Sequence, residues 1–69
     1  MTILVNGASR EVGSRNQDMT VEELIVELGQ QGRPLIVERN GKALVRSEWA
    51  ETNVHEGDRY ELVLLVAGG

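Results

Sequence analysis

The alternation of apolar and polar positions is clearest near the end of the chain. The Gly57-Asp58 pair is a turn signal, and seven residues typical of a β-strand follow it, from Tyr60 to Val66. Successive side chains of a strand point to opposite faces. One face then carries Tyr60, Leu62, Leu64 and Val66, and the other carries Glu61, Val63 and Leu65. Since apolar residues on both faces are typical of interior strands, we expect this strand to be central in a sheet.

Two Asn-Gly pairs predict β-hairpins, because each follows a short apolar run. Asn6-Gly7 would join a strand at Thr2-Ile3-Leu4-Val5 to a more polar edge strand at residues 9–12. Asn40-Gly41 would join a strand at residues 35–39 to a brief return at residues 42–45. Residues 46–51 predict an irregular segment with one helical turn, in which Ser47 could be the cap and Trp49 a core anchor.

A helix is predicted to begin after Thr20. Thr20 with Glu23 forms the pattern of a capping box, and Met19 with Leu24 forms that of a hydrophobic staple. An apolar stripe follows at Val21, Leu24, Ile25 and Leu28, with Glu22, Glu23 and Glu27 on the wet face. Gly29 suits the position after the helix, and Pro34 prevents its continuation.

The element order β-β-α-β-β-β predicts an α+β fold. The first and last strands are the most apolar, so we expect them side by side in the middle of a mixed sheet of four or five strands. One main helix would pack across one face of that sheet. This arrangement is the β-grasp.

Strand parity also predicts an exposed apolar patch. If Leu62 and Leu64 face the helix with Ile3 and Val5, then Leu4, Val63 and Leu65 face away from it. No second helix is available to cover that outer face. We therefore expect Leu4, Val63 and Leu65 to form a docking surface, although scattered surface hydrophobes are common.

The sequence closes with Ala67-Gly68-Gly69, which carries almost no side-chain atoms. An extended tail of this kind would reach roughly 10 Å beyond the sheet and could thread a narrow channel. The carboxylate of Gly69 would be ionised at neutral pH and could attack the α-phosphate of ATP to become an acyl-adenylate. The chain has no G-x-x-x-x-G-K-[ST] loop and one lysine, Lys42, so ATP would be bound by another protein.

The composition excludes several kinds of site and of binding partner. The absence of cysteine excludes disulfides, thiolate zinc clusters and a cysteine nucleophile. The net charge of -4 argues against nucleic acid and membrane surfaces as partners. The lone His55 lies in a predicted turn and is interpreted as a solvated bystander. No basic segment followed by an apolar run opens the chain, and no apolar run approaches about 18 residues, so we expect a cytoplasmic protein. With no candidate catalytic group left, we also expect it not to be an enzyme and to bind no cofactor of its own.

The whole chain resembles the ThiS family of thiamine-biosynthesis sulfur carriers, which are ubiquitin-like β-grasp proteins. The most discriminating block runs from Val37-Glu38-Arg39-Asn40-Gly41 to Val45-Arg46-Ser47-Glu48-Trp49. The opening residues 3–7, the helix start at 20–24, Gly57-Asp58 and Gly68-Gly69 also match. Arg46 departs from the pattern, since many relatives have a proline there. This difference affects a local bend of the chain and not the chemistry.

The resemblance implies one domain at residues 1–69, with a flexible Gly-Gly tail, that serves as a cosubstrate of partner enzymes. A ThiF-like adenylyltransferase would activate Gly69 with ATP, and a persulfide donor would convert it to a thiocarboxylate. A ThiG-like thiazole synthase would then accept the sulfur. Gly68 and Ala67 would thread the partner's channel.

Four other functions fit parts of the pattern. Molybdopterin synthase small subunits share fold and tail but usually have a proline before the glycines, which Leu65-Val66-Ala67 lacks. A sulfur carrier of a secondary-metabolite pathway would look nearly the same. A ubiquitin-like modifier is less compatible with a single lysine, and a plain interaction domain would not need its tail.

Overall fold

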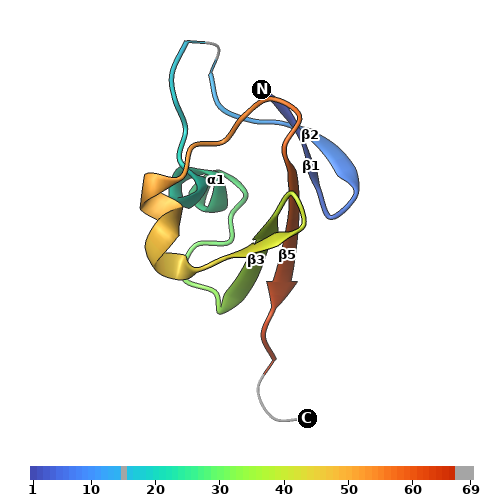
Figure 1. Ribbon diagram of the computed structural model, residues 1–69, viewed down its shortest axis with the longest axis vertical. Coiled ribbons are helices and arrows are strands. Elements are labelled where there is room, and N and C mark those ends of the chain that lie inside the picture. The colour runs from blue at the N-terminus through green and yellow to red at the C-terminus, as the bar shows by residue number, and fades with distance from the viewer. Residues whose placement is uncertain (15, 67–69) are drawn as a thin grey trace.

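In a computed structural model of the chain, which describes residues 1–14 and 16–66, five strands form one mixed sheet (Figure 1). The strands lie in the order β2-β1-β5-β3-β4. Their bounds are β1 Thr2–Val5, β2 Ala8–Glu11, β3 Leu35–Arg39, β4 Lys42–Leu44 and β5 Arg59–Leu64. The central position predicted for the last strand is therefore confirmed.

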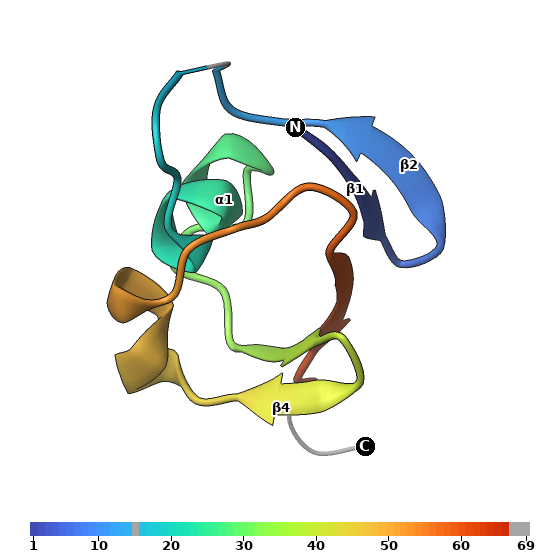
Figure 2. The same ribbon diagram turned by 45° about the horizontal axis from the view of Figure 1, so that its top comes forward.

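The sheet has the connectivity of a β-grasp, as predicted. β1 runs parallel to β5, whereas the pairs β1–β2, β3–β4 and β3–β5 are antiparallel. The sheet curves around helix α1, Val21–Glu27, which covers its inner face (Figure 2). We call the opposite side of the sheet the outer face.

The two Asn-Gly turns have the backbone geometry that their sequences predict. Asn6 and Gly7 have φ angles of 49° and 83°, and Asn40 and Gly41 have 52° and 84°. Positive φ at both central residues is the geometry of the type I′ turn, which matches the twist of the strands it joins. Each hairpin register is fixed locally for this reason.

The ends of α1 are stabilised as the sequence predicts. Thr20 Oγ1 accepts a hydrogen bond from Glu23 N–H at 3.2 Å, and Glu23 Oε1 accepts one from Thr20 N–H at 2.9 Å. At the other end Gly29 N–H donates to Val26 O and Gln30 N–H donates to Ile25 O, both at 3.0 Å. Gly29 has φ 74°, so this end is a Schellman motif.

The core lies between α1 and the inner face. Its buried apolar residues are Ile3, Val12, Met19, Val21, Leu24, Ile25, Val37, Trp49, Val54 and Tyr60. Trp49 is anchored there by its Nε1–H, which donates to Leu44 O at 3.1 Å, as expected for a core residue.

Three predicted details are wrong. The return strand is Ala8–Glu11 instead of 9–12, because Val5 pairs with Ala8 directly across the two-residue turn. β4 ends at Leu44, and a 3-10 helix, η1, follows at Arg46–Glu51. Its cap position is Val45 instead of Ser47, since Val45 N–H donates to Glu48 Oε1 at 3.2 Å.

Candidate functional site: the C-terminal end of strand β5

β5 leads from the centre of the sheet towards the last residues of the chain. The strand ends at Leu64, two residues earlier than predicted. Its final ladder bond runs from Leu65 N–H to Pro34 O at 2.8 Å. Pro34 has no N–H to return, so the antiparallel ladder between β3 and β5 stops there. Val66 follows with 82% of its surface exposed.

The residues predicted to carry the chemistry follow Val66 in the sequence. Ala67, Gly68 and Gly69 fall outside the described residues, and their predicted roles remain predictions. The described part of the site is therefore the surface that surrounds the point where they begin.

The predicted docking residues Leu4, Val63 and Leu65 are all exposed, by 39%, 51% and 53%. The sheet register, however, does not bring all three together. Leu4 lies opposite Arg59, four residues before Val63 on β5, which is about 13 Å along a strand. The prediction of one patch containing Leu4 is therefore wrong, because it assumed strand neighbours without their register.

Ile36 takes the place of Leu4 beside the other two residues. It lies directly opposite Val63 on β3 and is 42% exposed. We call Ile36, Val63 and Leu65 the outer patch. The sequence carries a signal for Ile36: since Val37 is an inward position, Ile36 must point outward.

Two carboxylates separate the outer patch from Leu4. Glu38 on β3 and Glu61 on β5 lie directly opposite each other. Neither forms an ion pair with any residue that the structure describes. Like charges at opposed positions destabilise a sheet, so this pair adds negative charge beside the outer patch at some cost in stability.

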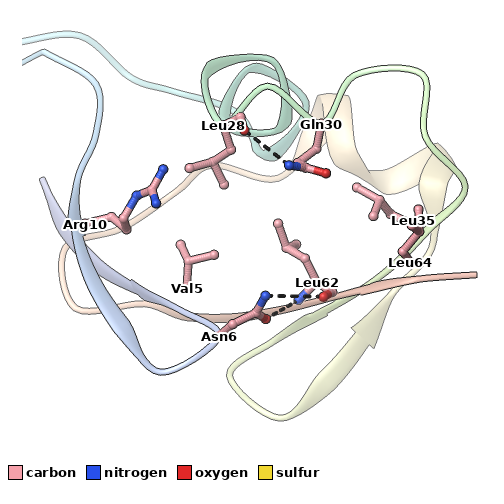
Figure 3. A pocket seen from close by; sticks show the side chains of 8 residues that line it. All are labelled: Val5, Asn6, Arg10, Leu28, Gln30, Leu35, Leu62 and Leu64. Atoms are coloured by element: carbon pink, nitrogen blue, oxygen red, sulfur yellow. Dashed lines mark hydrogen bonds between the residues drawn. The ribbon is translucent and has the colours of Figure 1, made fainter.

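The inner face is also open at this end of β5. Leu64 was expected to face the helix, but it remains 38% exposed. A cavity of about 240 Å³ lies there (Figure 3).

We call this cavity the inner groove. Its apolar walls are Val5, Leu28, Leu35, Leu62 and Leu64, and its polar residues are Asn6, Arg10 and Gln30. Figure 3 shows Leu28, just after α1, and the leucine side chains of β3 and β5 around one hollow, with Arg10 at its rim. The sequence did not predict the inner groove, since it depends on where the helix ends in space.

One side chain holds the strand beside the inner groove. Leu62 N–H donates to Asn6 Oδ1 at 2.8 Å, and Asn6 Nδ2 donates to Leu62 O at 3.4 Å. The side chain of Asn6 thus takes the place of the next residue of β1, which turns away at Gly7. A turn residue therefore stabilises the start of the site.

No metal site or membrane helix is found in the described residues. Residues 1–14 and 16–66 contain no group of three or more His, Cys, Asp or Glu placed to hold a metal ion. Within the same residues, no helix is long and apolar enough to cross a membrane.

Comparison with known proteins identifies the family. The family model described as "ThiS family" matches residues 3–69. This chain belongs to the ThiS family. The match covers the sheet, the helix and the terminal glycines together.

Solved structures agree with membership of the ThiS family. The chain is similar to the crystal structure of the thiamine biosynthesis protein ThiS from Geobacter metallireducens, with a TM-score of 0.83 and 33% identity. That comparison covers 100% of both chains. A solution structure of a thiamine biosynthesis protein from the same organism gives a TM-score of 0.78 at 33% identity, over 100% of this chain and 88% of the other.

A longer relative contains a ThiS-like region. The chain is 38% identical over its 69 residues to a thiazole synthase from Paramagnetospirillum magneticum. It spans about one fifth of that protein's length, since the match covers 20% of the relative.

At its opposite end, β5 of this ThiS-family chain is fixed by a buried carboxylate. Asp58 Oδ2 accepts hydrogen bonds from His55 N–H at 2.8 Å, Tyr60 Oη–H at 2.9 Å and Arg39 Nε–H at 3.1 Å. Asp58 Oδ1 accepts a fourth from Asn40 Nδ2 at 3.1 Å. Burial raises the pKa of Asp58, but these four donors together lower it below its ordinary value.

The same network changes the interpretation of His55. Its ring is exposed, but Nδ1 lies 2.9 Å from Arg39 Nη2. Since a guanidinium can only donate, His55 Nδ1 accepts this bond. Burial and the hydrogen bond to Asp58 raise the pKa of Tyr60 to about 12, so the phenol remains a donor. His55 is thus part of a structural network and not merely a solvated bystander.

Proposed function

We propose that this chain is a sulfur carrier of thiamine biosynthesis that works as a cosubstrate and not as an enzyme. The observation that carries the proposal is the family match over residues 3–69, which includes Gly68 and Gly69. The full mutual coverage with the ThiS protein of Geobacter metallireducens supports it. Similarity to a thiazole synthase favours thiazole formation over molybdopterin synthesis as the destination of the sulfur.

In the proposed cycle, a ThiF-like adenylyltransferase binds ATP. The carboxylate of Gly69 attacks the α-phosphate, and pyrophosphate leaves. A persulfide sulfur then attacks the acyl carbon and displaces AMP. A thiol opens the resulting acyl disulfide, which leaves a thiocarboxylate on Gly69 and a disulfide on the donor side. A ThiG-like thiazole synthase takes the sulfur and returns the carboxylate.

This chain's own contribution would be presentation of the tail. β5 is held on one side by β3 and on the other by β1 and Asn6, so the strand that leads to the tail has a fixed position. Gly68 and Ala67 would then enter the partner's channel, where side chains would not fit. Because activation uses ATP, we expect the cycle to run in the cytoplasm.

We assign the outer patch as the docking surface for the adenylyltransferase. Ile36, Val63 and Leu65 are each about half exposed and lie beside the point where the tail begins. The neighbouring Glu38 and Glu61 would attract a basic partner surface and set the orientation of docking. Buried apolar contacts would supply most of the affinity.

Intact-mass measurement tests the chemistry. The chain is incubated with the adenylyltransferase, ATP and a persulfide donor, and a thiol then opens the acyl disulfide, which should leave a mass gain of about 16 Da from exchange of one oxygen for sulfur. A variant that lacks Gly68 and Gly69 is the matched control and should gain nothing. An unchanged mass in the complete chain, under conditions that load another ThiS-family carrier, would overturn the proposal.

A further inference from the structure

Among the residues that the structure describes, none pairs with one edge of the C-terminal half of β5. Asn40 N–H donates to Arg59 O and Leu65 N–H donates to Pro34 O, so the odd-numbered residues of β5 direct their backbone groups to β3. The even-numbered residues direct theirs to the other side. There, Asn6 N–H donates to Tyr60 O and Leu62 N–H donates to Asn6 Oδ1.

Leu64 is the next residue in this series. β1 ends at Val5, and the Asn6-Gly7 turn carries the chain away into β2. No residue in the described part of the chain bonds the N–H or C=O of Leu64 on this side. We call these two groups of Leu64 the free edge. A free edge of this kind is a template for one more strand.

The inner groove lies beside the free edge. Its apolar walls, among them Leu35 and Leu62, are half-buried, and Leu64 is 38% exposed. Arg10 is the one charged residue that lines it, and it forms no ion pair with the described residues. A strand placed on the free edge would direct alternate side chains into this hollow. The groove is therefore matched to a segment with an apolar residue and a nearby carboxylate.

We propose that an extended segment of a thiazole synthase adds to the free edge as a sixth strand. Its backbone would pair with Leu64, one apolar side chain would fill the inner groove, and a carboxylate would bind Arg10. The assignment rests on the proposed function, because the thiazole synthase relative is what names the partner. It places this enzyme on a different surface from the one assigned to the adenylyltransferase.

Hydrogen exchange and paired variants test the proposal with the complete chain and the thiazole synthase of the same organism. In the complex, the Leu64 amide should become protected from exchange. Leu64→Pro removes the N–H, which has no hydrogen-bond partner among residues 1–14 and 16–66, whereas Leu64→Ala removes only side-chain contacts. Leu64→Pro should bind about tenfold more weakly than Leu64→Ala, as expected for the loss of one interface hydrogen bond.

The charge contact has its own test. Arg10→Glu should weaken binding to the thiazole synthase by about tenfold and leave binding to the adenylyltransferase unchanged. Arg59→Glu, on the outer face, is the matched control and should bind the thiazole synthase as the wild type does.

Two results would overturn the inference. One is equal affinity of Leu64→Pro and Leu64→Ala together with unchanged exchange at Leu64. The other is a loss of adenylyltransferase binding in Leu64→Pro or Arg10→Glu that is as large as the loss of thiazole synthase binding. That result would show that both enzymes use the same surface. Failure of the proposed function is a separate outcome, because the wild type would then gain no mass with the activating enzyme.

Discussion

The side-chain amide of Asn6 hydrogen-bonds both backbone polar groups of Leu62. Leu62 N–H donates to Asn6 Oδ1 at 2.8 Å, and Asn6 Nδ2 donates to Leu62 O at 3.4 Å. The two residues are 56 positions apart in the sequence. A residue that the first hairpin needs for its positive φ thus also fixes the strand that leads to the tail.

We expect Asn6→Gly to loosen the end of β5 while preserving the hairpin. Glycine adopts the φ of 49° without strain, so the main loss is the pair of hydrogen bonds to Leu62. The free energy of unfolding should fall by about 1 kcal/mol, and the Leu62 amide should exchange faster. Asn6→Asp keeps the acceptor for Leu62 N–H, so that amide should stay protected. Equal exchange at Leu62 in wild type and Asn6→Gly would contradict the role of Asn6.

The Asp58 network should make stability fall in acid. Because the folded state lowers the pKa of Asp58, this residue contributes stability at pH values above its unfolded pKa of about 3.9, and that contribution is lost as the pH falls towards the folded pKa. Asp58→Asn should lower the free energy of unfolding at pH 7 by about 3 kcal/mol. Urea unfolding at several pH values should then show a smaller further loss of stability in acid than the wild type shows. Asp18 is exposed, so Asp18→Asn is the control and should lose stability in acid as the wild type does. A reduced loss in this variant as well would point to general charge effects.

Leu65→Glu should separate docking from folding. Leu65 is 53% exposed and follows the end of β5, so we expect a change in unfolding free energy within about 0.5 kcal/mol. Binding to the adenylyltransferase should weaken by about tenfold or more, because a charge enters a buried apolar contact. Val26→Glu, at a 48% exposed position of α1, is the matched control and should bind normally. A large loss of thermal stability in Leu65→Glu would mean that the side chain belongs to the core.

Removing one of the opposed carboxylates Glu38 and Glu61 should raise the free energy of unfolding. Glu61→Gln removes like-charge repulsion and should stabilise the fold by about 0.5 kcal/mol at low salt. The gain should disappear near 1 M salt, where the screening length is about 3 Å. Urea unfolding at both salt concentrations measures it, with Glu51→Gln as a control outside the sheet. If both variants gain equally, the effect comes from net charge and not from the opposed pair.

Several features of the fold follow from the sequence because they are local. The Asn-Gly turns need positive φ at adjacent residues, and the capping box needs Thr20 and Glu23 three positions apart. Strand parity likewise predicts the exposure of Leu4, Val63 and Leu65. Each of these depends on neighbours within a few residues, so the chain specifies them without reference to the rest of the molecule.

The candidate site depended on contacts between distant segments. Strand register placed Ile36 beside Val63 and moved Leu4 away, since parity gives the face of a side chain but not its neighbour on the next strand. The placement of the residues after α1 over the inner face left Leu64 exposed beside the inner groove. The sequence by itself therefore determined the elements, their order and the glycine ending, whereas only the tertiary structure decided which exposed residues share a surface, because that depends on how separate elements align in space.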